Sequence, residues 1–413
     1  MPEQDSLLAA LLAPFSSAVF AREIFGQKPL YLAGQDHPEG PEHFAELFDW
    51  QALNDLLNFT PRLKIRIHHQ GLNYFYTPGA EQLGEAVMRL RQGGTLILER
   101  VDQAHGPLAR FADALSDEIA TPVQINLYLS YPGHAGYPAH YDLHDFFILQ
   151  IAGQKLWDVY PATMPNPLDV PASFKVPGLP LEPHAQAPDD SQKLLQALMQ
   201  PGDLLYVPKG FWHKALAQHS PSLHLTVGLR KHTGLDLTEW LLQHLRESEV
   251  LRQTLPLTHK EDLPHASGQT SPYQAAFDRI REALTGLLQN PELLARFHQD
   301  TYLSLERRQG FELPQLYLQD AVELQPAQHF VVRRVPHKRY LNPRQMLELS
   351  FPRNTLFFAA AAEPLLHFVL ERSHFSGTEL QQAFPDHPWP ALAGVLLPLV
   401  QEGLLVVAAG EEG

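Results

Sequence analysis

Short stretches in which apolar and polar residues alternate are typical of the first 230 residues and predict a set of β-strands. Arg62 to Ile67 alternates cations with apolar side chains, as a half-exposed strand would, and Thr95 to Leu98 is a second short candidate. Ala152-Gly153 predicts a turn, after which the chain would return alongside itself. Three further strands are expected where aromatic and β-branched residues concentrate: residues 124–130, 146–151 and 154–160.

Segments with helical spacing of apolar residues flank this strand-rich region. Phe44 to Phe48 and Trp50 to Leu57 are expected to be helices that pack against the strands. After Arg230 the pattern becomes helical, and Asp236, with Glu239 three positions on, is expected to cap the first helix. Further amphipathic helices are expected before about residue 307, and they need an apolar partner surface, either on the strand-rich region or on a second subunit.

The last part of the chain has the element pattern of a winged helix. Apolar helical or strand-like segments occur at residues 364–370, 378–384, 393–399 and 404–407. Winged helices often read DNA, but residues 363–413 contain seven carboxylate residues and a single Arg. A recognition helix without cations engages phosphates poorly. We therefore expect a structural or protein-binding role here, with no direct nucleic-acid binding.

His140-Tyr141-Asp142 is the strongest candidate for chemistry. Residues two apart share a face only in extended backbone, and the apolar residues that follow predict a strand context. His213 comes 71 residues after Asp142, behind the turn residues Gly202-Asp203 and a short apolar strand. Two imidazoles and one carboxylate on one face of a metal are the ligand set of non-haem Fe(II) oxygenases.

The spacing alone is weak, because roughly one His-x-Asp is expected by chance in a chain with this many histidines. A second copy does occur at His298-Gln299-Asp300. It lies in a segment with a helical pattern, where residues two apart point in different directions, so it is not expected to bind a metal. His37-Pro38-Glu39 lies in a Gly/Pro-rich stretch and is set aside as well.

Lys155 shares strand parity with Trp157 and Val159, so a cation would point the same way as two large apolar side chains. An ammonium on an apolar face requires a partner, because burying it unpaired is costly. A dicarboxylic acid cosubstrate would supply one. The alternative is that Lys155 lays its stem along the wall and keeps its charge in water.

Residues 126–160 and 202–213 together resemble the JmjC-type Fe(II)/2-oxoglutarate oxygenases, and more narrowly the cupin-4 branch, the ribosomal oxygenases. The resemblance implies an α+β chain: a double-stranded β-helix (JmjC/cupin barrel), then a helical dimerisation region, then a C-terminal winged-helix domain. The expected boundaries are 1–232, 233–325 and 326–413.

The same resemblance implies roles for individual residues. His140, Asp142 and His213 would be the catalytic metal ligands, and Lys155 would pair with the distal carboxylate of 2-oxoglutarate. Asn126 and Tyr128 match positions that line the cosubstrate pocket. His224 matches a position near the metal, although an ordinary buried histidine is the competing interpretation.

The function implied is that of an Fe(II)- and 2-oxoglutarate-dependent dioxygenase that uses O₂ to hydroxylate an Arg or His side chain of a ribosomal protein. An N-methyl demethylase is a variant of this reading. Two alternatives come from other classes: a cupin-type metalloenzyme that does not use 2-oxoglutarate, and a non-catalytic protein-binding module. The resemblance also implies a homodimer.

Composition and charge limit the chemistry, the partners and the location that we expect for this chain. The absence of cysteine excludes disulfides and cysteine-based metal or thiol chemistry. The net charge of −15 argues against broad nucleic-acid binding and suits a basic polypeptide partner, although many proteins are acidic simply for solubility. No apolar run is long enough to cross a membrane and the first residues lack the basic start of a signal peptide, so a cytoplasmic protein is expected.

Overall fold

The computed structural model describes most of the chain, with gaps. The described residues are 6–60, 63–77, 80–132, 137–167, 187–246, 248–258, 273–305, 308, 324–333, 338–341, 346–351 and 354–408. The chain divides into two compact units, residues 1–231 with 306–311, and residues 232–305 with 312–413. Each unit is described by itself.

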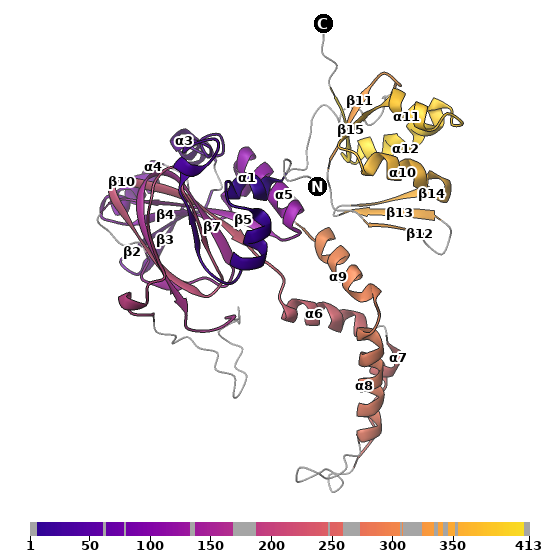
Figure 1. Ribbon diagram of the computed structural model, residues 1–413, viewed down its shortest axis with the longest axis horizontal. Coiled ribbons are helices and arrows are strands. Elements are labelled where there is room, and N and C mark those ends of the chain that lie inside the picture. Colours follow the sequence, from indigo (N-terminus) through magenta and orange to yellow (C-terminus); the bar gives the residue numbers. More distant parts are fainter. Residues whose placement is uncertain are drawn as a thin grey trace. The chain divides into compact units, whose positions relative to one another are not determined.

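The first unit is built on one strongly curved antiparallel sheet (Figure 1). Its strand order is β1-β9-β7-β10-β5-β4-β2-β3, with β6 added to β10 and β8 added to β7. The long strands β7 and β10 pair over most of their length and form the centre of the sheet. The strands are β1 (Leu30–Leu32), β2 (Ile65–His69), β3 (Leu72–Tyr76), β4 (Thr95–Leu98), β5 (Val123–Ser130), β6 (His140–Tyr141), β7 (Asp145–Ala162), β8 (Leu195–Met199), β9 (Leu204–Val207) and β10 (Phe211–Leu229).

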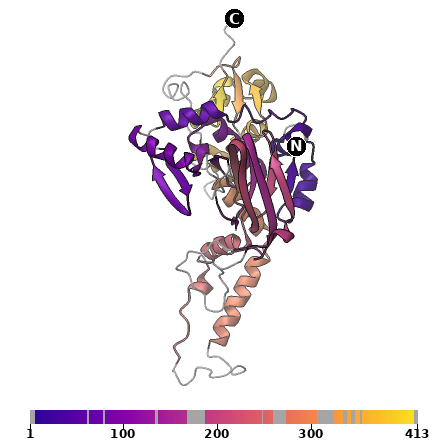
Figure 2. The same ribbon diagram turned by 90° about the vertical axis from the view of Figure 1, so that its left-hand side faces the viewer.

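Helices lie on the outside of this sheet, as Figure 1 and the turned view in Figure 2 show. The helices are α1 (Leu7–Leu12), α2 (Ser17–Val19), α3 (Trp50–Phe59), α4 (Ala80–Arg91) and α5 (Gly106–Ile119), with short helical turns at Phe20–Ile24, Gly34–Asp36, Val101–Gln103 and Asp190–Gln192. The helix expected from Trp50 is confirmed and begins behind Asp49, whose carboxylate accepts a hydrogen bond from the Ala52 N–H. The helix expected at Phe44 to Phe48 is wrong. That segment is a series of turns in which Phe44 and Phe48 are buried, so packing of two aromatic anchors sets its conformation.

The turn predicted at Ala152-Gly153 is also wrong. Strand β7 runs continuously through both residues, and β10 pairs with it on either side. Gly153 has φ +67, and a Cβ added to it would lie 2.0 Å from the Pro221 carbonyl oxygen. Glycine therefore bends the strand and admits close approach of β10, without reversing the chain.

Two clusters of buried apolar side chains pack against the sheet, one on each face. The larger cluster lies between the sheet and the outer helices and includes Phe20, Leu98, Leu115 and Tyr206. The smaller cluster, on the other face, contains Phe146, Ile148, Trp157 and Val159 among its members. Burial of apolar side chains on both faces explains why residues 146–149 of β7 and the whole of β9 consist of apolar and aromatic residues.

Arg308, which comes late in the sequence, is buried within the first unit. Arg308 is 206 residues from Asp102, yet its Nε donates to the Asp102 carboxylate and its Nη1 lies 2.7 Å from Asp113 Oδ1. Asp102 is fully buried, and its other oxygen accepts a hydrogen bond from the Ile125 N–H at 2.8 Å. The Arg308 guanidinium thus neutralises a carboxylate in the interior.

The second unit begins with α6 (Gly234–Leu245), α7 (Glu249–Arg252), α8 (Gln274–Leu288) and α9 (Glu292–Leu303), which confirms the helices expected in this region. The predicted cap is one turn too late. Thr233, with Asp236, forms the capping box at the start of α6, because the Thr233 hydroxyl and the Asp236 carboxylate satisfy each other's backbone N–H groups.

Two three-stranded sheets and three helices follow. Their order is β15-β11-β16 in one sheet and β12-β13-β14 in the other. They share one buried apolar cluster that includes Phe330, Leu366, Leu396 and Leu405. The elements are β11 (His329–Val332), β12 (Lys338–Leu341), β13 (Met346–Phe351), β14 (Asn354–Ala359), a helical turn at Ala360–Ala362, α10 (Glu363–Leu370), β15 (His374–Ser376), α11 (Gly377–Ala383), α12 (Trp389–Gln401) and β16 (Leu405–Val407). Among the described helices of both units, none has the length and apolarity needed to cross a bilayer.

Candidate metal centre

His140 and His213 face each other across a strand pair. They are register partners of the antiparallel ladder between β6 and β10, and their ring centroids are 4.3 Å apart. Asp142 follows β6 on the same face. One ligand atom from each of these three residues lies within 4.8 Å of the other two. This spacing is compatible with three ligands around one metal ion, with further coordination positions left open.

Hydrogen bonds to the backbone orient both imidazoles. His140 Nδ1 lies 2.9 Å from the Pro138 carbonyl oxygen, and His213 Nδ1 lies 3.2 Å from that of Phe211. Carbonyls accept only, so each Nδ1 carries the proton and each Nε2 keeps its lone pair. This is the usual outer-shell device that fixes the tautomer of a liganding histidine.

The electrostatics of the cluster suit a cation. Burial, and to a smaller extent the neighbouring His140, lower the pKa of His213 to about 4 against the opposing effect of Asp142. His213 is therefore neutral near pH 7. Its Nε2 lies 4.0 Å from Asp142 Oδ2, so two potential ligand atoms lie close together without forming an ion pair. Neutral imidazoles and an ionised carboxylate are the forms that bind divalent metals.

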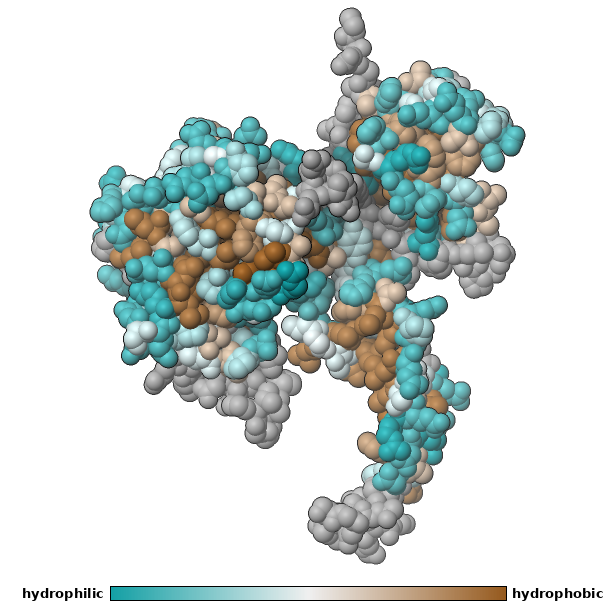
Figure 3. Space-filling model, viewed as in Figure 1, coloured by the Kyte–Doolittle hydropathy of each residue, from teal (hydrophilic) through white to brown (hydrophobic). Residues whose placement is uncertain are grey.

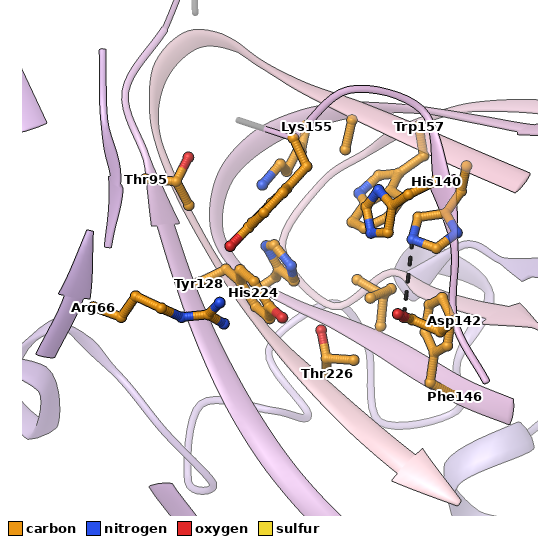
Figure 4. Close-up of a pocket in the computed structure, with 14 residues that line it drawn as sticks. Arg66, Thr95, Tyr128, His140, Asp142, Phe146, Lys155, Trp157, His224 and Thr226 are labelled. Atoms are coloured by element: carbon orange, nitrogen blue, oxygen red, sulfur yellow. Dashed lines mark ion pairs between the residues drawn. The ribbon is translucent and has the colours of Figure 1, made fainter. Parts of the chain in front are cut away.

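The three residues lie at one side of a cavity of about 260 Å³ inside the curved sheet (Figure 4). Of the residues expected to bind 2-oxoglutarate, Lys155, Tyr128 and His224 line this cavity. Asn126 is engaged elsewhere: its Oδ1 accepts a hydrogen bond from the Arg100 N–H at 2.9 Å, and it is not among the lining residues. The described lining consists of Arg66, Thr95, Tyr128, Tyr137, His140, Asp142, Phe146, Ile148, Lys155, Trp157, His213, Ala215, His224 and Thr226.

Lys155 is a buried cation in this cavity. Only 5% of it is exposed, and burial lowers the pKa of its ammonium to about 7. Its Nζ donates a hydrogen bond to Ser130 Oγ at 3.1 Å. Within the described part of the chain, no carboxylate is paired with it. An anion in the cavity would supply the missing charge.

His224 and Trp157, which also line this cavity, each have a buried polar atom without a hydrogen-bond partner. The His224 ring stacks on Tyr128 at 5.1 Å and meets the Trp157 ring edge-on at 5.4 Å. Burial, with a smaller effect from Lys155, holds the pKa of His224 well below its usual value, so this imidazole is neutral. Its Nδ1 and the Trp157 Nε1 are buried without a hydrogen-bond partner. Buried polar atoms normally have partners, so these two indicate a ligand.

Several lining residues were not anticipated from the sequence, among them Arg66, Thr95, Tyr137 and Thr226. Arg66 pairs with Glu99 at 2.7 Å. Arg66 on β2 is the register partner of Ile97 on β4, and Ile97 is the register partner of Tyr128 on β5. Side chains of register partners leave a sheet on the same face, so strand periodicity combined with this pairing places Arg66 on the cavity side with Tyr128.

The competing histidine motifs lie elsewhere. His298 is exposed on α9, as the helical pattern predicted. His37 stacks on His43 with a centroid distance of 3.8 Å. Among the described residues, the His140, Asp142 and His213 cluster is the one group suited to a metal.

Comparison with known proteins gives a family for the region that holds this site. Residues 101–237 match the JmjC domain family. The chain is 30% identical to rat ribosomal oxygenase 1 over 256 residues, which is 60% of this chain and 41% of that protein. Identity to the Drosophila mojavensis bifunctional lysine-specific demethylase and histidyl-hydroxylase NO66 is 25% over 268 residues, 62% of this chain and 29% of that protein. The chain thus spans about two fifths or less of the length of these relatives.

Solved structures agree on the fold. An X-ray structure of Escherichia coli YcfD superposes with a TM-score of 0.60 at 17% identity, covering 95% of this chain and 98% of that one. The structure of the same ribosomal oxygenase with cobalt and 2-oxoglutarate gives a TM-score of 0.59 at 17% identity, with coverage of 96% and 99%. The predicted resemblance to JmjC-type ribosomal oxygenases and the predicted JmjC/cupin fold are therefore confirmed.

Proposed function

We propose that this chain, whose residues 101–237 are a JmjC domain, is an Fe(II)- and 2-oxoglutarate-dependent dioxygenase that hydroxylates a ribosomal protein. The observation that carries the proposal is the pairing of two features in one cavity. A cluster of two histidines and one aspartate converges on one side, and the buried Lys155 ammonium, without a carboxylate partner, lines the same cavity. An iron ion would be held by the histidine–aspartate cluster, and a dicarboxylate would supply the negative charge that pairs with Lys155.

The residues present fit these two groups. His140, Asp142 and His213 would hold the iron, and Lys155 would pair with the carboxylate of 2-oxoglutarate that is remote from the metal. The buried Nδ1 of His224 and Nε1 of Trp157 offer further hydrogen bonds. When bound, iron and 2-oxoglutarate would supply the oxidising chemistry, in which O₂ is consumed and succinate and CO₂ are released.

The protein's own contribution is position and exclusion of water. Backbone carbonyls aim the two imidazoles, and Phe146, Ile148 and Trp157 form an apolar part of the cavity lining. A dry, pre-shaped site protects a reactive oxidant from side reactions.

The substrate assignment is supported by the similarity to ribosomal oxygenase 1 and by the charge of −15, which complements a basic ribosomal protein. We propose an Arg or His side chain as the target. The NO66 relative is described as both a histidyl-hydroxylase and a lysine-specific demethylase, so removal of an N-methyl group is the second candidate. It requires the same oxidation, at a carbon attached to nitrogen.

We further propose that residues 233–325 form a homodimer with a second copy of the chain. Supporting this, large apolar side chains are exposed along α6, α8 and α9, and Figure 3 shows apolar surface over these helices. They are Leu235, Leu242, Phe277, Leu288 and Leu294, each more than half exposed. A sedimentation measurement that finds only monomer at micromolar concentration would rule this out.

The segment 326–413 is proposed to be a winged-helix domain. The helices α10, α11 and α12 with the sheet β15-β11-β16 support this. The scarcity of cations in residues 363–413, which hold seven carboxylate residues and a single Arg, favours a structural or protein-binding role.

Succinate release tests the enzymatic proposal. Lys155→Ala should abolish 2-oxoglutarate-dependent succinate release by the iron-loaded protein while the bound metal remains. A cupin metalloenzyme that does not use 2-oxoglutarate would release no succinate and would be insensitive to this substitution. A non-catalytic binding module would release none and would keep its partner binding in His140→Ala.

A further inference from the structure

Strand β3 forms an unprotected edge of the curved sheet. It is the last strand in the sheet order, and among the described strands it pairs with β2 alone. An edge strand turns a row of N–H and C=O groups away from its neighbour, and proteins usually protect such an edge with a proline, a lysine or a bulge. The residues of β3, Leu-Asn-Tyr-Phe-Tyr, include no proline and no charge, and their register with β2 is unbroken. The edge is therefore open to pairing with another extended chain.

One face of the hairpin formed by β2 and β3 continues the wall of the cavity. Phe75 is the register partner of Arg66, and Asn73 is that of His68, so these four side chains leave the sheet on one face. Arg66 lines the cavity (Figure 4). Tyr137, which also lines it, stacks on His68 with a centroid distance of 3.9 Å and donates a hydrogen bond to Asn73 Oδ1 at 3.4 Å. The surface thus runs without a break from the cavity to the edge strand.

Phe75 stands out among the aromatic residues of β3 because it is 72% exposed. The two tyrosines on the other face of the strand pack on α4. The Arg89 guanidinium lies 3.5 Å from the centre of the Tyr74 ring, and its Nε donates to the Tyr76 hydroxyl at 2.7 Å. Aromatic side chains of this kind are the usual anchors of protein interfaces.

We propose that β3 binds an extended segment of the polypeptide substrate as an added strand, and that Phe75 anchors this segment beside the cavity. The segment is one that flanks the oxidised residue. This inference rests on the proposed oxidation of a protein side chain. Main-chain hydrogen bonds to a sheet edge supply affinity, and contacts to alternate side chains of the added strand supply specificity. Every second residue of the bound segment would face Phe75 and the cavity side.

The position of the edge favours a substrate segment over a second copy of the chain. A protein whose side chain enters the cavity must lay its main chain across the adjoining surface, where Arg66 and Tyr137 lie. A second copy paired to β3 would cover that surface. The exposed carboxylates beside the hairpin, Glu85 and Glu99, are each already paired with an arginine. Binding here therefore depends on the main chain and on Phe75 more than on charge.

Substitution of Phe75 tests the side-chain part of the inference in the full-length, iron-loaded protein. The probe is the mixture of ribosomal proteins extracted from ribosomes with acid. Phe75→Ala should raise the KM for this mixture at least about tenfold, the effect of truncating one aromatic anchor of an interface, and Phe75→Leu should restore most of it. The affinities for Mn²⁺ and 2-oxoglutarate should change less than about twofold, because Phe75 does not line the cavity.

The matched control is Phe59→Ala on α3. Phe59 is 79% exposed and, like Phe75, is not among the residues that line the cavity. It does not belong to the sheet, so its truncation should leave the KM for the ribosomal proteins unchanged.

Hydrogen exchange tests the main-chain part. In the protein alone, the N–H groups of residues 72–76 that point away from β2 should exchange rapidly. With Mn²⁺ and 2-oxoglutarate bound, addition of the ribosomal proteins should slow their exchange at least about tenfold, because an amide that is hydrogen-bonded to an added strand is protected.

The outcomes separate this inference from the proposed function. If the wild type releases no succinate and oxidises no ribosomal protein, both are wrong. If it oxidises a ribosomal protein, but Phe75→Ala keeps the KM of Phe59→Ala or residues 72–76 exchange equally fast with and without ribosomal proteins, the inference alone is wrong. Protection of residues 72–76 that rises with the concentration of the chain by itself would assign the edge to a second copy and would also contradict it.

Discussion

His140 and His213 are register partners on β6 and β10, and each directs its Nδ1 at the backbone carbonyl of the residue two positions before it. The two Nε2 atoms are thereby left on the same side as the Asp142 carboxylate. The geometry of the site is thus a property of the backbone, and it exists before a metal arrives.

Removal of either imidazole should abolish metal binding. His140→Ala and His213→Ala are each expected to weaken Mn²⁺ affinity by more than about 100-fold, beyond the effect of losing an outer-shell partner. Calorimetric titration with Mn²⁺ measures this. The control is His298→Ala, which removes the exposed histidine of the other His-x-Asp and should bind Mn²⁺ like the wild type. Wild-type affinity in His140→Ala would refute the ligand assignment.

Binding of 2-oxoglutarate should depend on pH through Lys155. Burial lowers the pKa of this ammonium to about 7 in the free protein, and a bound carboxylate would raise it. Above pH 7, binding therefore requires uptake of a proton, and affinity should fall as the pH rises through that value. Calorimetry in buffers of different ionisation enthalpy measures the proton uptake.

Lys155→Arg is the control for this pH effect, because arginine stays protonated throughout the range. If it binds 2-oxoglutarate, it should do so without proton uptake. Proton uptake that is unchanged in Lys155→Arg would assign the titration to another group.

The buried Arg308 should stabilise the first unit. Arg308→Ala leaves Asp102 buried with an uncompensated charge, and we expect the free energy of unfolding to fall by about 3–5 kcal/mol. Denaturant unfolding followed by tryptophan fluorescence measures the loss. Arg22→Ala, which breaks an exposed pair with Glu23, should cause no measurable change. Equal effects of the two substitutions would show that Arg308 does not act as an internal counter-ion.

A side chain at position 153 should not be tolerated. Gly153→Ala places a Cβ 2.0 Å from the Pro221 carbonyl oxygen at a φ of +67, so we expect a loss of at least about 3 kcal/mol or failure to fold. Gly84→Ala on α4 has nothing within 4 Å and should stabilise the protein by roughly 0.5–1 kcal/mol. Thermal melting of the two variants compares them, and a Gly153→Ala protein as stable as the wild type would contradict the bend described here.

The metal cluster was predictable because it depends on short-range rules. Period-two alternation places His140 and Asp142 on one face, and parity in a strand places Lys155 beside Trp157. The JmjC/cupin fold followed from the resemblance to known oxygenases, which the comparisons confirm.

What the sequence did not reveal depends on contacts between distant residues. Arg308 and Asp102 are 206 positions apart, and no local pattern joins them. The hydrogen bond between Ser130 and Thr95 depends on the register between β4 and β5, and the bend at Gly153 depends on where β10 passes. The amide of Asn126 is taken up by Arg100, whose backbone has a φ of +53, a conformation that the residue type did not suggest.

The central claim is tested most directly by mass spectrometry of ribosomal proteins after incubation with the iron-loaded protein, 2-oxoglutarate and O₂. The account predicts that one ribosomal protein gains the mass of one oxygen atom on an Arg or His side chain, with an equal amount of succinate formed. Neither product should appear with His140→Ala. Unchanged masses of all the ribosomal proteins, together with no succinate above the level of the His140→Ala control, would contradict it.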